Sequence, residues 1–242
     1  MSCKTIKKEC FKRIVEDVKQ IILNPLKDQN IHYVHDEDNF LNGYAMIIGP
    51  EDTPYQYGYY FFHFLFPEDY PYSPPVVKYL TNDGYTRFHP NFYRSGKCCL
   101  SILNTWKGEE WSSCLTITSI LLTLSMVLTK NPLIHEPGIE EGSNDVQVYN
   151  EIIEFQNFNH SIRFVLKNKP YFFFTCIPNV TIDKEIFMEE CKSHFDKNRK
   201  KILNYLESKA NISKHELSFN IYNMYSNIID YPNLYKLIKK LK

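Results

Sequence analysis

The sequence predicts an α+β fold: one helix, then an antiparallel four-stranded sheet, then further helices. Apolar residues recur at helical spacing in the opening segment, which indicates the first helix. Four segments rich in β-branched and aromatic residues follow, which indicates strands. The links between these segments are too short for crossover helices, so we expect the strands to form an antiparallel meander.

The first predicted helix ends before Pro25, because proline lacks the amide hydrogen that a helix needs and clashes with the preceding turn. Lysines, among them Lys8 and Lys12, occupy the surface that its apolar residues leave. These lysines form either a solvated face or a docking face for an acidic partner, and periodicity alone favours the solvated face. The apolar positions are Phe11, Ile14, Val15, Val18, Ile21 and Ile22.

The predicted strands are separated by turns that contain proline. Residues 66–75 hold four prolines, which prevent regular structure, and one X-Pro bond there is a candidate for the cis form. From Thr81 to Glu110 no period is strong, and so long an irregular stretch inside a compact domain is either functional or misread. The predicted strands are Ile31–Val34, Tyr44–Ile48, Tyr59–Phe66 and Val76–Leu80.

The second half of the chain is predicted to be mostly helical. The sequence pattern changes after Pro170. We therefore divide the chain into a core of residues 1–170 and a C-terminal helical extension of residues 171–242. Ser213 and Glu216 fit a capping box, and Pro232 suits a first helical turn. A short aromatic run spans Tyr171–Thr175. The predicted helices are Leu115 to Lys130, Val146 to Lys167, Ile182 to Ser208, Lys214 to Ser226 and Pro232 to Leu241.

Composition excludes several classes of protein. Lys plus Arg and Asp plus Glu both number 28, so the neutral chain has no bulk attraction to nucleic acid or to an anionic membrane. The longest apolar run, Ile117 to Leu128, is too short to cross a bilayer, and from the Lys-rich start, which has no apolar stretch, we expect no secretory signal. The seven cysteines are irregularly spaced and include no Cys-x-x-Cys pair. We therefore expect no metal site and an intracellular protein with reduced thiols. Within the cell we expect it in the cytoplasm, either there alone or in the nucleus as well.

One cysteine, Cys99, stands in a motif that carries chemistry. His89-Pro90-Asn91 precedes it, and Leu100-Ser101-Ile102-Leu103 follows it. This stretch resembles the active-site region of ubiquitin-conjugating enzymes, in which the same tripeptide precedes a nucleophilic cysteine at this spacing. Further signatures similar to that family occur in the same order along the chain: Gly49-Pro50, Thr53-Pro54-Tyr55, Phe66-Pro67, Tyr70-Pro71 and Pro74-Pro75.

Within that family the chain most resembles the large subfamily that contains ubiquitin-conjugating enzyme Z. The resemblance implies the UBC fold and a transferase. Such an enzyme accepts ubiquitin or a ubiquitin-like modifier as a thioester from an activating enzyme, then passes it to a substrate lysine or to a ligase. It implies a monomer without a cofactor of its own, since the activating enzyme consumes the ATP. The subfamily motifs are Asn91-Phe92-Tyr93-Arg94, Thr105-Trp106, Trp111-Ser112, Asn131-Pro132 and Glu136-Pro137-Gly138.

The resemblance also implies roles for the residues around the motif. Cys99 is the expected nucleophile, whereas Cys98 suits the core, because neighbours in an extended segment point to opposite sides. The amide of Asn91 is expected to stabilise the oxyanion, to support the turn, or both. His89 and Pro90 are expected to shape the turn. His135 stands where many relatives place a residue that orients the incoming lysine, so it is either catalytic or a bystander.

Partner surfaces follow from the resemblance in the same way. The lysines of the first helix, Lys8 and Lys12, would face the activating enzyme. Tyr72 resembles the aromatic residue that ligases contact, and Trp111 and Ser112 open the second ligase-contacting loop. Ser112-Ser113-Cys114 stands where the family has Ser-Pro-Ala, so a proline that stiffens this loop is missing.

Two other classes of function stay open beside the transferase. One is a UBC-like module that binds ubiquitin or partners without catalysis, although the retained Cys99 argues against it. The other is a cysteine hydrolase in which Cys99 pairs with His89 or His135.

Overall fold

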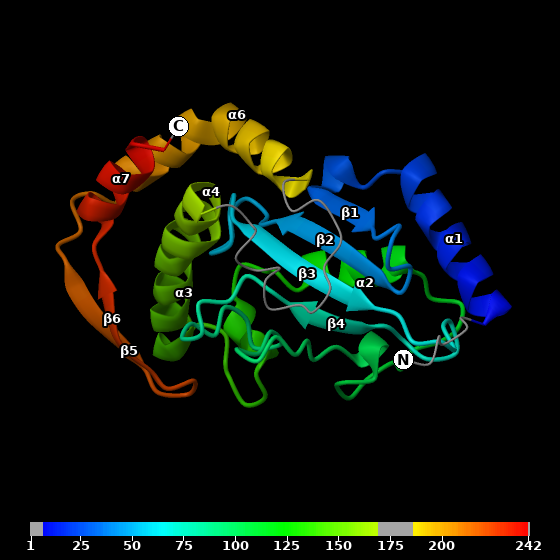
Figure 1. The fold of residues 1–242 in the computed structure, drawn as a ribbon. Helices are drawn as coiled ribbons and strands as arrows, with labels where there is room; N and C mark the ends of the chain where they lie inside the picture. Colours follow the sequence, from blue (N-terminus) through cyan, green and yellow to red (C-terminus); the bar gives the residue numbers. More distant parts are fainter. Residues whose placement is uncertain (1–6, 169–185, 242) are drawn as a thin grey trace.

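The computed structural model of the protein describes residues 7–168 and 186–241 (Figure 1). Helix α1 spans Lys8–Leu23 and ends just before Pro25, as predicted. The strands are antiparallel and adjacent in chain order, so the predicted meander is confirmed. The strands are β1 (Ile31–His35), β2 (Asn42–Ile48), β3 (Tyr59–Leu65) and β4 (Val76–Tyr79).

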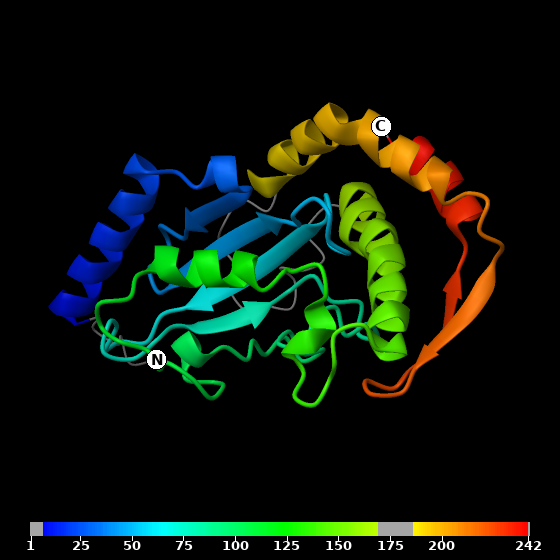
Figure 2. The same ribbon diagram turned by 180° about the vertical axis from the view of Figure 1, so that it is seen from behind.

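One face of the sheet packs on helix α2, which spans Ile117–Met126 and lies in front of the strands in Figure 2. Its N-terminus has a capping box between Thr116 and Ser119, which satisfies amides that the first turn leaves free. Alternate residues of the strands, such as Ala45 and Phe62, form one apolar cluster with α1 and α2. This cluster also supports the stretch between β4 and α2 that contains Asn91 and Cys99, which we call the active-site segment because the sequence predicts the active site there.

On the other face of the sheet, strands β2 and β3 pack against the C-terminal extension. Tyr44, Met46, Tyr59 and Phe61 alternate with the residues of the first face and join a second apolar cluster with helices α6 (Ile186–Ser208) and α7 (Tyr231–Lys239). Strand β3 is buried on both faces for this reason, and its nearly continuous aromatic sequence is typical of a strand inside two layers.

A long helical segment connects the core with the extension. Helix α3 (Asn144–Gln156) continues through the π-helix η4 (Asn157–Phe164) into α4 (Val165–Asn168), which confirms the predicted helix. The buried Asn157 side chain anchors it to the sheet: its oxygen accepts from Tyr60 Oη at 2.7 Å and its nitrogen donates to the carbonyl of Gln56 at 2.9 Å.

The predicted helix from Lys214 to Ser226 is wrong. These residues lie in an antiparallel hairpin of strands β5 (His215–Phe219) and β6 (Met224–Ile229). Leu217 and Phe219 turn inward while their neighbours turn outward, a period of two that the helical interpretation overlooked. The capping box predicted at Ser213 is therefore absent from this segment, and Glu216 lies in β5.

The hairpin packs beside α3, on the side away from the sheet (Figure 1). Its two strands contact α3, and α6 contacts α7. The extension therefore consists of helices and a small sheet, rather than helices alone. The aromatic run Tyr171–Thr175 and the proposed boundary at residue 170 lie outside the described residues, so the division into two domains stays a prediction.

Candidate functional site

The active-site segment lies between β4 and α2 and contains neither an α-helix nor a named strand, as the missing period predicted. Isolated bridges hold it instead, because Phe92 pairs with His89 and with Cys98. The amide of Tyr79, at the end of β4, donates to the carbonyl of Gly96 at 2.7 Å. The segment is thus fastened along the edge of the sheet.

Asn91 and Cys99 lie side by side. The backbone amide of Cys99 donates to the carbonyl of Asn91 at 2.8 Å, and the side-chain Nδ2 of Asn91 donates to the carbonyl of Cys99 at 2.6 Å. Oδ1 of Asn91 is buried and has no hydrogen-bond partner among the described residues. One Nδ2 hydrogen thus fixes the backbone at Cys99, and the amide group retains a second hydrogen.

The two adjacent cysteines occupy different surroundings. Cys98 belongs to the first apolar cluster, and burial raises the pKa of its thiol far above the usual value. Cys99 is also only 3% exposed, yet it lies outside both apolar clusters of the described residues. Their alternation matches the expectation for neighbours in an extended segment.

His89 uses both of its ring nitrogens within the protein. Nε2 donates to the carbonyl of Val127 at 2.9 Å, so Nδ1 is left as the acceptor for the backbone amide of Asn91 at 3.0 Å. Burial, with a smaller contribution from His135, lowers the pKa of His89 to about 3. A neutral imidazole with both nitrogens engaged braces the turn at Asn91 and has no nitrogen left for a substrate.

His135 lies at the end of the short helix η3 (Pro132–His135), close to the same turn. Its ring centroid is 5.3 Å from that of His89. Partial desolvation lowers the pKa of His135, so its imidazole is neutral at neutral pH. The fold therefore brings three of the predicted residues, His89, Asn91 and His135, around one turn.

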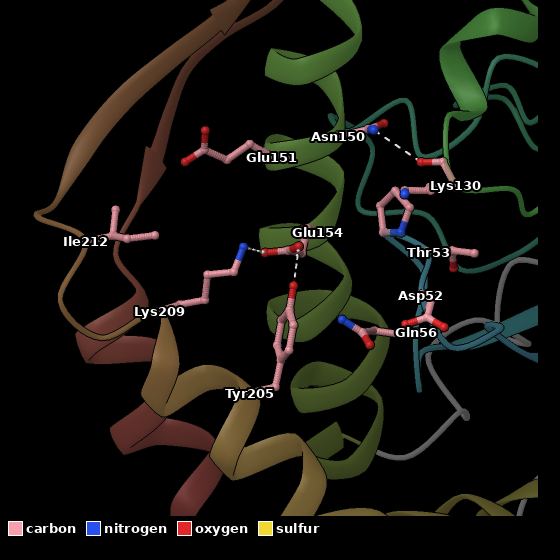
Figure 3. A pocket seen from close by; sticks show the side chains of 11 residues that line it. Asp52, Thr53, Gln56, Lys130, Asn150, Glu151, Glu154, Tyr205, Lys209 and Ile212 are labelled. Carbon is pink, nitrogen blue, oxygen red and sulfur yellow. Dashed lines mark hydrogen bonds and ion pairs between the residues drawn. The ribbon is translucent and has the colours of Figure 1, made fainter. Parts of the chain in front are cut away.

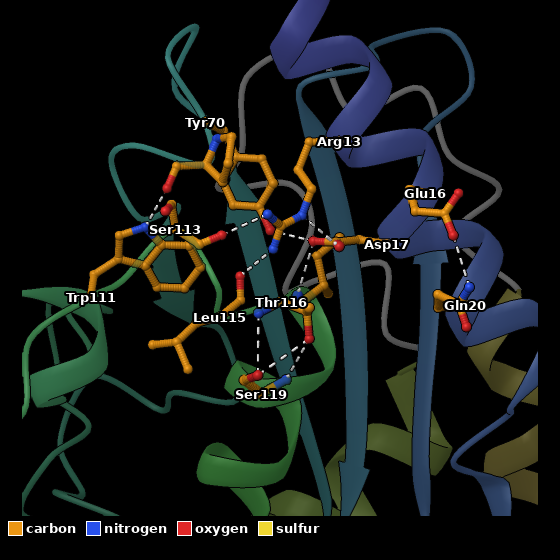
Figure 4. A network of polar contacts seen from close by, with 12 residues as sticks. Arg13, Glu16, Asp17, Gln20, Tyr70, Trp111, Ser113, Leu115, Thr116 and Ser119 are labelled. Atoms are coloured by element: carbon orange, nitrogen blue, oxygen red, sulfur yellow. Dashed lines mark hydrogen bonds and ion pairs between the residues drawn. The ribbon is translucent and has the colours of Figure 1, made fainter.

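The two predicted partner loops lie beside α1 (Figure 4). Tyr72 is 68% exposed, and Ser112 is exposed as well. Between them Trp111 donates its indole N–H to the carbonyl of Pro71 at 2.7 Å and packs on Tyr70. The peptide bond between Tyr70 and Pro71 is cis, in the loop where the sequence predicted one. Trp111 thus joins the two loops instead of pointing freely into solvent.

Arg13 holds the loop of residues 112–115, which is the second predicted partner loop. Its guanidinium donates to the carbonyls of Ser113 at 2.6 Å and Leu115 at 2.5 Å, and to Asp17 at 2.9 Å (Figure 4). Asp17 is only 4% exposed and also accepts from the hydroxyl of Tyr70. The sequence contained a signal for this network: an acidic residue stands on the apolar side of the first helix, where an unpaired charge is costly.

Lys8 and Lys12 are exposed on α1, which is the position that a docking face requires. Among the described residues, neither lysine makes a hydrogen bond or an ion pair with the turn that contains His89 and Asn91. The structure therefore separates the predicted residues into a group around Cys99, which we predicted to be catalytic, and a peripheral group on α1 and its neighbouring loops.

A polar cavity of about 690 Å³ lies between the core and the extension (Figure 3). Glu154 of α3 is at its centre and accepts from Tyr205 at 2.6 Å, Tyr231 at 2.6 Å and Lys209 at 2.9 Å. These contacts attach α6 and α7 to α3. None of the predicted site residues lines the cavity, so we interpret it as part of the junction between the two regions.

Two searches of the described ranges gave negative results. In residues 7–168 and 186–241, His, Cys, Asp and Glu side chains form no group of three or more that is arranged to hold a metal ion. Within the same ranges, every helix is too short or too polar to span a membrane.

Comparison with known proteins places these features in a family. The family model "Ubiquitin-conjugating enzyme" matches residues 13–157. The chain is 40% identical over 164 residues to ubiquitin-conjugating enzyme E2 Z of Xenopus tropicalis, covering 66% of this chain and 52% of that protein. Human ubiquitin-conjugating enzyme E2 Z is 39% identical over 164 residues, covering 66% of this chain and 46% of the relative. The chain thus spans about half the length of these relatives.

A nematode relative aligns over a longer stretch. The probable ubiquitin-conjugating enzyme protein 17 of Caenorhabditis elegans is 34% identical over 199 residues, covering 76% of this chain and 27% of that protein. Among solved structures, human ubiquitin-conjugating enzyme E2 G1 is 26% identical, with a TM-score of 0.45, and covers 52% of this chain and 98% of the other. The predicted similarity to the enzyme Z branch is confirmed, and because the family model covers more than half of the sequence, the chain belongs to the ubiquitin-conjugating enzyme family.

Proposed function

We propose that the protein is a ubiquitin-conjugating enzyme that carries ubiquitin or a ubiquitin-like modifier on Cys99. It receives the modifier from an activating enzyme and transfers it to a substrate lysine or to a ligase. The observation that best supports this proposal is the reciprocal pair of hydrogen bonds between Asn91 and Cys99, inside the segment that matches the family.

Two acyl transfers make up the proposed reaction. In the first, the Cys99 thiolate attacks the modifier's thioester carbon, a new C–S bond forms, and the activating enzyme's thiolate leaves. In the second, a lysine amine attacks the same carbon, a C–N bond forms, the bond to Cys99 breaks, and the nitrogen loses a proton. No cofactor of this chain takes part, and the ATP is consumed by the activating enzyme.

Asn91 has two parts in this proposal. One Nδ2 hydrogen holds the backbone carbonyl of Cys99, which fixes the turn, and the other is available to an oxyanion that develops next to it. Loss of such a donor typically slows a reaction by ~10²–10³-fold. His89 and Pro90 position this amide. His135, neutral at neutral pH, is the residue we propose to accept the amine proton during lysine attack.

The outer surfaces are assigned to protein partners. Lys8 and Lys12 on α1 would face an acidic activating enzyme, while Tyr72, Trp111 and Ser112 would face a ligase. Because Arg13 fixes the carbonyls at Ser113 and Leu115, the loop is held in place without the family's proline. We propose a monomer that acts in the cytoplasm and nucleus and needs neither nucleic acid nor a membrane.

The form of the hydrolase alternative that pairs Cys99 with His89 is disfavoured by the surroundings of that histidine, whereas the pairing with His135 is left to the assay below. A Cys–His pair needs an imidazole that takes a proton from the thiol. His89 already uses both nitrogens, and burial lowers its pKa to about 3, so it is a poor base.

A charging assay tests the proposal and its alternatives together. The protein is incubated with an activating enzyme, ATP and ubiquitin or a ubiquitin-like modifier, and the products are separated on a non-reducing gel. We expect a thiol-sensitive adduct that disappears in Cys99→Ala. Failure to charge with every activating enzyme tried would indicate a binding module, whereas release of ubiquitin from a conjugate without activating enzyme would indicate a hydrolase.

A further inference from the structure

The tip of the β5–β6 hairpin reaches from the extension to the active-site segment. Tyr222 lies in the turn between the two strands, and the backbone carbonyl of this residue accepts a hydrogen bond from Arg94 at 2.6 Å. Arg94 lies between Asn91 and Cys99 in the sequence. The extension therefore contacts the segment that carries the nucleophile directly.

The side chain of Tyr222 contacts the loop that follows α2. Its hydroxyl donates to Oε2 of Glu136 at 2.6 Å, and Glu136 is the residue after His135. Burial and the adjacent carboxylate raise the pKa of Tyr222 far above its usual value, so the hydroxyl stays protonated and remains a donor. One residue of the hairpin thus links the active-site segment to the loop of His135.

A partly buried arginine extends this link to the turn of His89 and Asn91. The guanidinium of Arg87 donates to the carbonyl of His89 at 3.1 Å and to that of Pro90 at 2.5 Å. The same group lies over the ring of Tyr93, with its carbon 3.3 Å from the centroid, and 5.3 Å from the centroid of Tyr222. These contacts fix the carbonyls of the two residues that precede Asn91.

Helix α3 of the core also holds the hairpin tip in place. The ring of Tyr149, on α3, packs against Phe219 at 5.2 Å and against Tyr222 at 5.8 Å. Its hydroxyl donates to the carbonyl of Arg87 at 2.6 Å, and the amide of Arg87 contacts the sulfur of Met224 at 3.3 Å. The position of Tyr222 is therefore set by both the hairpin and α3, and it does not depend on the active-site segment alone.

We propose that Tyr222 is a positioning residue for the second transfer step. It acts through Arg87 and Arg94 on the turn that presents Asn91, and through Glu136 on the loop that carries His135. The extension is then a component of the active site, although it contributes no group that touches the reacting atoms. This inference rests on the proposed conjugating function for the identity of the reaction.

The expected effect concerns geometry around the thioester. Without the Tyr222 ring, Arg87 and the His135 loop lose one of their supports, and the Asn91 amide is held less firmly beside Cys99. A displacement of ~1 Å in a catalytic group can cost ~100-fold in rate. Because Arg87 keeps its own bonds to His89 and Pro90, we expect a smaller effect, ~10-fold.

Single-turnover discharge to free lysine tests the proposal. The protein is charged, the activating enzyme is stopped, and the loss of thioester is followed at increasing lysine concentrations. Tyr222→Ala should lower the maximal rate ~10-fold and leave the half-saturating lysine concentration unchanged. Tyr222→Phe keeps the ring and the backbone acceptor but loses the bond to Glu136, so it should restore most of the rate.

The chain offers a matched control on the same hairpin. Tyr225 lies three residues after Tyr222, is 51% exposed, and its hydroxyl donates to Asn223 in the same turn. The contact of this residue with the core is made by its backbone carbonyl, which accepts from Tyr85 and survives substitution. Tyr225→Ala should therefore discharge at the wild-type rate.

Alkylation of Cys99 gives a second readout that needs no modifier. The rate of iodoacetamide labelling of each cysteine is measured by peptide mass spectrometry, with the exposed Cys114 as internal reference. Tyr222→Ala should label Cys99 several-fold faster, because the segment opens more often, while Cys114 labels at the same rate.

Thioester discharge and Cys99 labelling together distinguish failure of this inference from failure of the proposed function. If the wild-type protein fails to charge but Tyr222→Ala accelerates Cys99 labelling, the conjugating function is wrong and the structural link stands. If the wild type charges and Tyr222→Ala discharges and labels like the wild type, the inference is overturned. Should the alanine variant fail to fold, Tyr222→Leu takes its place, since it removes the ring and the hydroxyl but keeps an apolar side chain, and wild-type values of both rates in that variant overturn the inference.

Discussion

The central strands β2 and β3 are largely buried on both faces, but different parts of the chain cover the two faces. Phe62 joins the cluster formed with α1 and α2, while Phe61, its neighbour, joins the cluster formed with α6 and α7. The first cluster contains Cys98 and supports the candidate active site, whereas the second contains none of the predicted site residues. The comparison shows that a region without chemical motifs is as deeply integrated into the core as the region that carries them.

The largest expected effect tests whether side chains on the two faces contribute equally to the free energy of unfolding. Phe61→Ala and Phe62→Ala each remove a fully buried ring, so each should lower the free energy of unfolding by ~3–5 kcal/mol. Urea unfolding followed by tryptophan fluorescence measures both. A cost below ~1 kcal/mol for Phe61→Ala alone would show that the extension is not docked on this face.

Much of the first face was predictable from sequence, because its elements have strong periods and its motifs have family spacing. The second face was harder. From the sequence we predicted only a strand at β3, and neither its burial on both sides nor a partner for the second side. The hairpin was missed because each of its strands is short, and a few alternating residues do not outweigh an apparent helical period.

Tyr57 illustrates what the sequence alone does not disclose. Its backbone has φ 62°, in the left-handed region that glycine favours. Its ring is buried and lies 6.2 Å from that of His194 on α6. The extension thus provides packing for a side chain at a position where the backbone disfavours one.

In the candidate site, too, some features were predictable from the sequence and others were not. The segment of Asn91 and Cys99 was recognisable from residues that are close in sequence. The hydrogen bonds from Arg13 to the loop at Ser113, which we call the clamp, and the bond between Arg94 and Tyr222 join residues that are ~100 or more positions apart. A local sequence pattern cannot predict such contacts.

The second prediction concerns the clamp on the first face. Arg13→Ala leaves the carboxylate of Asp17 buried without its ion-pair partner, so it should cost ~2–3 kcal/mol of stability. Arg13→Lys is the matched control, since it keeps a charge near Asp17 but loses the fork that reaches Ser113 and Leu115. Equal unfolding free energies for wild type and Arg13→Ala would contradict the role of the clamp.

The third prediction compares one histidine from each side of the sheet. Burial lowers the pKa of His63 to about 4 and that of His89 to about 3. The unfolded chain, with an ordinary pKa of ~6.5, binds these protons more readily. Stability should therefore be complete above that value and fall as the pH drops from ~6.5 toward about 4, by up to ~1.4 kcal/mol per pH unit for each histidine.

Unfolding measured between pH 7 and pH 4.5 checks this dependence. His63→Asn should reduce the slope by about one proton, while the slopes of both proteins should coincide above pH 7. An unchanged slope in the variant would show that His63 titrates normally in the folded protein.

Neighbouring cysteines with different surroundings provide the most direct test of the central claim, which is that Cys99 carries the modifier. The measurement is intact mass spectrometry of charged wild type, Cys98→Ala and Cys99→Ala, followed by mapping of the thiol-sensitive adduct. We predict one modifier per chain in the wild type and in Cys98→Ala, attached at Cys99, and none in Cys99→Ala. An adduct that persists in Cys99→Ala, or that maps to Cys98, would contradict the account.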